Sequence, residues 1–145
     1  MQTDNREFII FNLSLSPLNL NREINLGDID LQNLRLQTSF IITYTLKKNI
    51  IVMQFILRYM YNDLELVSMG TRLGVEVSES FLEELKNDSY KSNPELKETV
   101  TYIMAFTTGA MYNSLQGTVL NSLNPAFIEA DKLIATIKLE KVEVD

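Results

Sequence analysis

The fold is decided by residues 34–77, which read LRLQTSFIITYTLKKNIIVMQFILRYMYNDLELVSMGTRLGVEV. Apolar side chains occupy every second position in three consecutive runs, 34–46, 51–61 and 64–77. A period of two is typical of a strand with one buried face. The polar segments Lys47-Lys48-Asn49 and Asn62-Asp63 separate the runs, so the pattern predicts an antiparallel meander of three strands. Gly70 and Gly74 lie in the third run, where we expect a β-bulge.

The segment before the meander predicts one more strand. Residues 6–16 alternate weakly between apolar and polar positions and are followed by Pro17, which cannot donate to a β-ladder. Residues 18–29 show no stable period, and we expect an extended or looped connection there.

Helices are predicted after the meander. Ser78 or Ser80 can cap a short helix that ends near Lys86. Asn93-Pro94 combines a capping residue with proline at the first helical position, and the apolar residues that follow predict a helix of about 20 residues, or 30 Å. Asn124-Pro125 predicts a short C-terminal helix. Residues 137–145 fit a strand, a helix or a disordered tail equally well.

The expected fold class is therefore α+β. A four-stranded antiparallel sheet, formed by the meander and the N-terminal strand, packs with one long helix and a short C-terminal helix. Residues 1–145 are of a length that one domain accommodates, and 46% of them are hydrophobic, which is enough for a core.

The long helix lacks the charged stripe that a surface helix normally carries. No charged residue stands between Glu98 and Glu129. A helix that packs on one sheet face usually presents charges on its other side. We therefore expect contacts on both sides, with a subunit interface as the simplest source. The candidate interface residues are Tyr102, Met104, Phe106, Met111 and Tyr112.

Composition argues against several classes of function. The chain has 13 basic and 19 acidic residues, so nucleic acid, which is bound mainly by lysine and arginine, is an unexpected partner. Histidine and cysteine are both absent, which removes the commonest general base, the commonest metal ligands and any disulfide. We therefore expect that this protein is not an enzyme, and that it has no catalytic residues, no metal-binding residues and no cofactor. The sequence has no apolar segment long enough to predict membrane insertion, and we expect the protein to be cytoplasmic.

A candidate binding site lies in residues 50–61. This run is apolar at its odd positions and also at Val52, Ile56 and Met60, so the strand is either covered on both faces or partly open to a ligand. In the second interpretation, Met60 and Tyr61 form a groove rim with Tyr44 across the hairpin. Tyrosine suits such a rim because its ring is apolar while its hydroxyl stays hydrated.

Two segments of the helical half are distinctive: Val100-Thr101-Tyr102-Ile103 followed by Ala105-Phe106-Thr107, and Leu123-Asn124-Pro125-Ala126-Phe127. In these segments and in the order of its elements, the chain resembles the SecB chaperone family. The family's Phe-Pro pair is Val-Thr here, and its fuller proline-rich segment is reduced to one proline. The order covers nearly the whole chain, whereas the residue match covers about 30 positions.

The resemblance implies a homotetramer built as a dimer of dimers, with long helices between two four-stranded sheets. It also implies apolar grooves that hold unfolded polypeptide clients without nucleotide, for protein export or in a toxin–antitoxin system. A translocation ATPase docks on an acidic sheet face in this family, and Asp28, Asp30, Asp63 and Glu65 are the candidates here. The alternative is a non-catalytic interaction module, such as a phage or mobile-element protein, with one dedicated protein partner.

Overall fold

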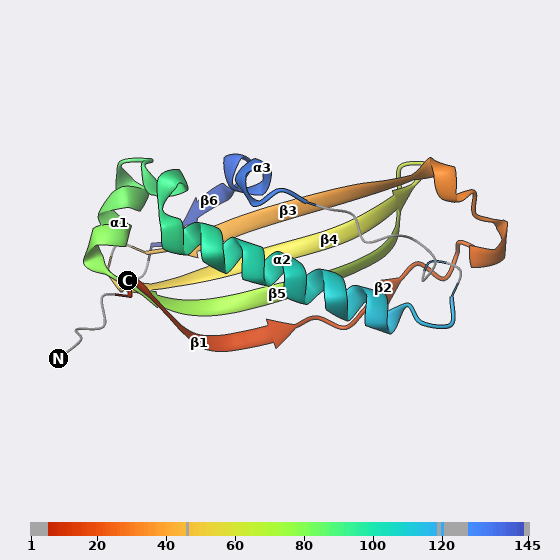
Figure 1. Cartoon of the computed structure of the whole chain (residues 1–145), viewed down its shortest axis with the longest axis horizontal. Coiled ribbons are helices and arrows are strands. Elements are labelled where there is room, and N and C mark those ends of the chain that lie inside the picture. Colours follow the sequence, from red (N-terminus) through yellow and green to blue (C-terminus); the bar gives the residue numbers. More distant parts are fainter. Residues whose placement is uncertain (1–5, 46, 119, 121–127, 144–145) are drawn as a thin grey trace.

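One mixed sheet organises the chain (Figure 1). The computed structural model describes residues 6–45, 47–118, 120 and 128–143. Within them the strands are β1 (Phe8–Leu15), β2 (Asn19–Leu20), β3 (Leu34–Tyr44), β4 (Ile50–Tyr61), β5 (Leu64–Val77) and β6 (Lys138–Lys141). Their order across the sheet is β1-β5-β4-β3-β6, and β2 also pairs with β5.

The predicted meander is confirmed. β3, β4 and β5 pair as antiparallel neighbours, with Phe40 opposite Phe55 and Phe55 opposite Thr71. The turn between β4 and β5 places Asn62 and Asp63 at φ values of 48° and 66°. Asparagine and aspartate tolerate this left-handed conformation, which suits the twist of a tight hairpin.

The predicted long helix is α2 (Pro94–Ser114), and it crosses β4 and β5 on one face of the sheet (Figure 1). The Asn93 side chain accepts hydrogen bonds from the backbone N–H groups of Glu95 and Leu96, so Asn93 caps the helix as expected. Buried residues on the sheet side of α2, such as Val100, Ile103 and Met111, close the core against the buried positions of the strands.

The other helices are short. α1 (Glu79–Lys86) begins after Ser78, whose hydroxyl accepts from the Phe81 N–H group, so Ser78 rather than Ser80 is the cap. α3 is Ala130–Ala135. The expected start of this helix at Asn124-Pro125 lies outside the described residues. Short 3-10 turns occur at Leu26–Asp28, Leu31–Asn33 and Tyr90–Ser92.

The α+β class is confirmed, but the expected four-stranded antiparallel sheet is wrong in its strand count and in its direction. β2 is a two-residue addition to β5. β6 pairs with β3 in parallel, from Ile41 opposite Lys138 to Tyr44 opposite Lys141, so the sheet is mixed. The open alternative for residues 137–145 therefore resolves to a strand for Lys138–Lys141.

The expected bulge between Gly70 and Gly74 is also wrong. β5 pairs with β4 without interruption there, and the irregularities lie between Tyr59 and Met60 and between Ile10 and Asn12. The glycines instead allow close approach. A Cβ atom on Gly74 would lie 2.7 Å from the Phe11 ring, and one on Gly70 would lie 3.1 Å from the Phe55 carbonyl oxygen.

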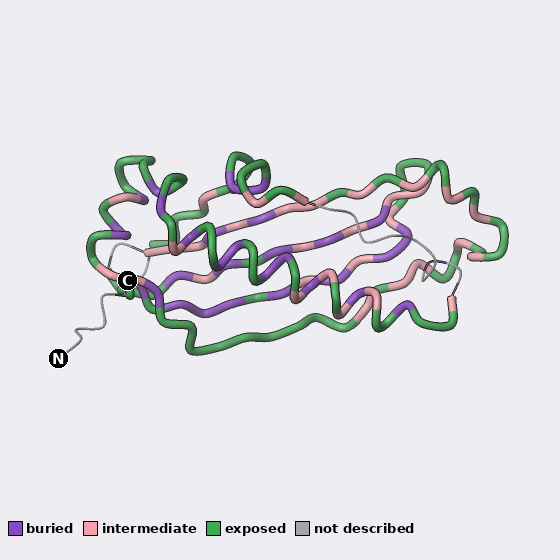
Figure 2. The backbone as a smooth tube through the Cα atoms, viewed as in Figure 1, coloured by how far each residue is buried: buried purple, intermediate pink, exposed green. Residues whose placement is uncertain are grey.

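The sheet has one covered face and one open face. α2 covers the face that carries Ile51, Met53 and Phe55, all fully buried. We call the opposite side the open face; its side chains come from the alternate positions, including Gln54, Ile56 and Arg58 of β4. Figure 2 shows buried segments concentrated in β4 and β5, whereas β3 is mostly intermediate and β1 is exposed along most of its length.

Candidate functional site

The first candidate site is the outer edge of β1. β1 is the last strand on its side of the sheet, and no other described strand pairs with its outer edge. Its sequence, FIIFNLSL, contains no charge. Its exposed apolar side chains are Ile9, Ile10, Phe11, Leu13 and Leu15. Natural edge strands usually carry charges or proline that discourage further pairing, and β1 carries neither.

Hydrogen bonds hold β1 in place near both ends. At its start, the Glu95 carboxylate at the first turn of α2 accepts from the backbone N–H groups of Glu7 and Phe8, at 2.8 to 3.0 Å. Just beyond its end, the Ser16 N–H donates to the Gly70 carbonyl oxygen, and the Gly70 N–H donates to the Ser16 hydroxyl, both at 2.8 Å. The edge is therefore a preformed strand.

The second candidate site is the outer side of α2. Thr101, Tyr102, Ala105 and Gly109 are exposed there, and none is charged. The rings of Tyr102 and Phe106 stack with centroids 6.1 Å apart and an interplanar angle of 20°. A Cβ atom on Gly109 would meet nothing within 4 Å. This side of the helix thus combines an aromatic pair with small residues that permit close approach of another helix.

The five predicted interface residues divide between the two sides of α2. Met104 and Met111 belong to the core, with exposed fractions of 7% and 0%, so a partner does not reach them while the fold is intact. Tyr102 is exposed, and Phe106 and Tyr112 are partly buried. Subunit contact through these three side chains stays a prediction.

The three predicted client-binding residues are not brought together. Tyr44 is opposite Ile51, whereas Tyr61 is opposite Leu34 at the other end of the same strand pair. Ten residues of extended strand separate the two levels, or about 33 Å. Met60 is on the open face, whereas Tyr44 and Tyr61 are on the covered face. The expected common rim is therefore wrong, because the hairpin register separates its members.

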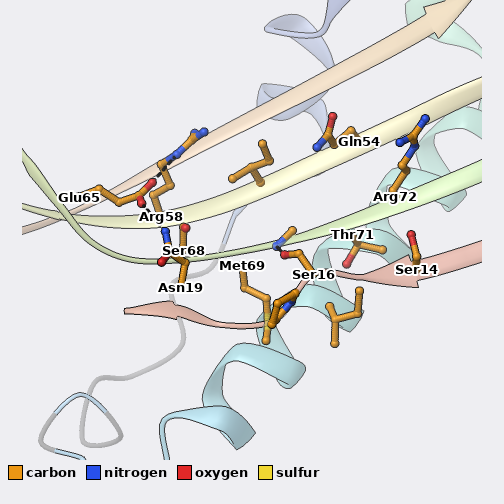
Figure 3. A pocket seen from close by; sticks show the side chains of 14 residues that line it. Ser14, Ser16, Asn19, Gln54, Arg58, Glu65, Ser68, Met69, Thr71 and Arg72 are labelled. Atoms are coloured by element: carbon orange, nitrogen blue, oxygen red, sulfur yellow. Dashed lines mark hydrogen bonds and ion pairs between the residues drawn. The ribbon is translucent and has the colours of Figure 1, made fainter. Parts of the chain in front are cut away.

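A hollow of about 530 Å³ lies on the open face, and sequence reasoning missed it. Figure 3 shows Gln54, Arg58 and Arg72 projecting on one side of the strands, with Met69 directed to the other. Arg58 forms an ion pair with Glu65 at 3.0 Å. Arg72 is exposed and has no such partner among the described residues. The one feature of the sequence that could have indicated this hollow is Gly70, which has no side chain and lies on the same face as Arg58 and Arg72.

The candidate acidic residues for ATPase docking are engaged in local contacts. Asp63 pairs with Arg35 at 2.6 Å, and Glu65 pairs with Arg58. Asp28 accepts from the Asn25 side chain, and Asp30 accepts from the Gln32 N–H group. Asp63 and Glu65 are thus ion-paired, whereas Asp28 and Asp30, in the connection before β3, accept hydrogen bonds from neutral amides only.

Two buried tyrosines have perturbed titration. Burial, together with the 3.0 Å hydrogen bond to the Tyr112 hydroxyl, raises the pKa of Tyr59 well above its ordinary value. Burial, followed by the charge of nearby Asp88, raises the pKa of Tyr90. In both cases the neutral phenol is favoured, as expected for a structural role in a core.

Within the described part of the chain, no three acidic side chains are arranged to hold a metal ion. None of the described helices combines the length and the apolar composition required to span a bilayer. No family model matches this sequence, and the search of curated proteins found no match.

Proposed function

We propose that this protein is a SecB-like molecular chaperone that binds unfolded or preprotein polypeptides without nucleotide. The observation that carries this proposal is the uncharged outer edge of β1, with apolar side chains exposed on both faces of the strand. Export and toxin–antitoxin roles both use such binding.

An unfolded polypeptide offers what this edge accepts. Its backbone has free N–H and C=O groups, and its apolar side chains are exposed to water. When an extended segment pairs with a sheet edge, its backbone hydrogen bonds form whatever its sequence. Its side chains then lie alternately on the two faces of the sheet. Ile10 and Leu13 lie on the side of the sheet that bears α2, whereas Ile9 lies on the open face. Both faces of a bound segment would therefore meet apolar surface.

The fixed position of β1 favours this function. Binding to a flexible edge would require the edge to become ordered, at a cost in conformational entropy. The contacts of Glu95 with the start of β1 and of Ser16 with Gly70 meet that requirement in advance. A preformed strand binds more tightly than a disordered one of equal composition.

The outer side of α2 supports a homo-oligomer as part of the same proposal. The stacked Tyr102–Phe106 pair and the small residues Ala105 and Gly109 would be covered by a second copy of this helix. A dimer of dimers needs two different contacts for each subunit. A translocation ATPase has weaker support, because Asp63 and Glu65 are paired with arginines.

The test is suppression of aggregation for several unrelated unfolded proteins, without nucleotide. We expect the wild-type protein to suppress aggregation of all of them. Leu13→Lys places a charge on the exposed edge of β1 and should reduce suppression about tenfold. The control is Leu64→Lys, which changes a leucine at the start of β5 that is 57% exposed, against 39% for Leu13, and should leave activity unchanged.

Three outcomes contradict the proposal. A wild-type protein that protects none of the unfolded proteins, yet binds one native protein tightly, is a dedicated interaction module. Equal effects of the two lysine substitutions would show that β1 is not the binding edge. Loss of the oligomer in Leu13→Lys, seen by sedimentation, would assign β1 to a subunit contact. Denaturation of each variant verifies folding, since exposed substitutions rarely cost more than about 0.5 kcal/mol.

A further inference from the structure

The open face has an apolar cluster next to a cation. Ile9, Phe11 and Ile50 are 55%, 57% and 42% exposed at one end of this face, where the exposed Glu76 stands between Ile9 and Ile50. The Phe11 ring lies over Gly74, because a Cβ atom there would be 2.7 Å from it. Gly74 pairs with Val52 on one side and Asn12 on the other, so the ring lies at the level of these residues.

Arg72 lies two residues along β5 from Gly74, on the same face of the sheet. Its neighbours across the sheet are Gln54 on β4 and Ser14 on β1, both neutral. The other arginines of this face each have a carboxylate partner: Arg58 has Glu65 and Arg35 has Asp63. No ion pair or hydrogen bond of the Arg72 side chain exists within the described residues.

The hollow gives a ligand room to reach Arg72. Gly70, which has no side chain, lines the hollow opposite Ile56, between the levels of Arg58 and Arg72. Arg58 and Ser68 are at one end, and Arg72, Gln54 and Ser14 are at the other. The two arginines and Glu65 give the lining a net charge of +1, whereas the chain as a whole has −6.

We propose that this face holds an extended polypeptide segment in which an apolar residue stands two positions from an aspartate or glutamate. The apolar side chain packs on Phe11, and the carboxylate pairs with Arg72. The two levels are two strand residues apart, or about 7 Å, which is the spacing of side chains i and i+2 on one face of an extended peptide. This inference rests on the proposed polypeptide binding and specifies which segments are preferred.

The charges explain why both contacts are needed. Arginine binds carboxylates through two parallel hydrogen bonds, which adds direction to the attraction. The remaining negative charge of the chain repels a purely acidic peptide. A segment therefore binds most tightly when an apolar residue on Phe11 places its carboxylate at Arg72.

The test uses fluorescently labelled extended peptides measured by anisotropy at low salt. One peptide has an apolar residue two positions before glutamate, the second replaces the glutamate with glutamine, and the third moves the glutamate to the next position. We expect the first peptide to bind about tenfold more tightly than the other two. Because surface ion pairs are screened, this preference should shrink at high salt.

Variants assign the preference to the two residues. Arg72→Gln should abolish the difference between the glutamate and glutamine peptides without weakening the glutamine peptide. Phe11→Ser should weaken both peptides. The matched control is Arg35→Gln, which removes another open-face arginine, one already paired with Asp63, and should change neither affinity.

Different failures have different meanings. If the wild-type protein binds no peptide and protects no unfolded protein, the proposed function itself fails. If it binds the glutamate and glutamine peptides equally, or if Arg72→Gln weakens both equally, only the present inference is overturned. Displacement of the first peptide by inorganic phosphate at millimolar concentration would show a general anion site and would also overturn it.

Discussion

The side-chain hydroxyls of Thr71 on β5 and Thr107 on α2 lie 2.6 Å apart in the buried contact between sheet and helix. The Thr107 hydroxyl also donates to the Ile103 carbonyl oxygen at 2.7 Å. A hydroxyl has one proton, so Thr107 uses it on Ile103 and the Thr71 hydroxyl is the donor between the two threonines.

This direction predicts unequal effects of two similar substitutions. Thr107→Val leaves the Thr71 proton buried without an acceptor and should lower the free energy of unfolding by about 1–3 kcal/mol. Thr71→Val removes only a donor and should cost less. The double variant should be no less stable than Thr107→Val, because both groups are then apolar. Urea denaturation measures all three, and equal losses from the single variants would contradict the assigned direction.

The second prediction concerns the substitution of Asn93. It is 3% exposed, caps α2, and donates through its amide to the carboxylates of Glu7 at 2.6 Å and Glu84 at 2.8 Å. Aspartate caps helices as well as asparagine does. Asn93→Asp nevertheless replaces the shared donor with a third carboxylate, and should lower the free energy of unfolding by about 2–3 kcal/mol.

The control for this prediction is Asn93→Ser, which keeps a capping oxygen and adds no charge. It should be more stable than Asn93→Asp at pH 7. The gap between the two variants should narrow as the pH falls toward about 4, where carboxylates begin to bind protons. An aspartate variant as stable as wild type would show that the amide donor has no structural role.

The third prediction concerns alkaline pH. Because the pKa of Tyr59 is raised in the folded state, the unfolded chain loses this proton first, near pH 10. The contribution of Tyr59 to the free energy of unfolding is fully present below that pH. It is lost as the pH rises above it, at up to about 1.4 kcal/mol per pH unit. Tyr59→Phe should make the free energy of unfolding decline less steeply between pH 9 and 11. An unchanged slope in urea titrations would contradict the prediction.

The fourth prediction concerns oligomerisation through α2. Sedimentation at micromolar concentration should show a dimer or tetramer. Tyr102→Asp, at a residue 51% exposed in the single chain, should dissociate it, because an unpaired carboxylate in an apolar interface costs several kcal/mol. Met104→Asp should instead unfold the subunit, since Met104 is in the core.

The matched control places the same charge on an exposed turn. Gln32→Asp should leave the oligomer intact, because Gln32 is exposed and far along the chain from α2. A wild-type protein that sediments as a monomer over the whole concentration range would refute the interface and the oligomeric part of the proposed function.

Much of the fold was predictable because its information is local. Alternation in residues 34–77 defines three strands, and Asn93-Pro94 defines the start of α2. β6 was not predictable, because four residues pair in parallel with β3, which precedes them by nearly a hundred positions. Periodicity within so short a segment contains no information about such a partner.

The candidate site was only partly predictable. The exposed face of α2 follows from the missing charges, and Tyr102 was identified on that basis. The error at Tyr44 and Tyr61 was avoidable: counting outward from the β3–β4 turn already places Tyr44 near Ile51 and Tyr61 at the far end. The place of Phe11 over Gly74 depends on a bulge in β1, and alternation alone does not reveal it.

The two edges of the sheet differ in a way that limits the addition of further strands. On one side the outermost strand is β6, which is four residues long and has exposed Lys138 and Lys141 with Glu140 between them. On the other side is the uncharged β1. New strands can thus be added in one direction only. Two copies joined through β1 would expose only β6 at both ends, so polymerisation into fibres would terminate after one step.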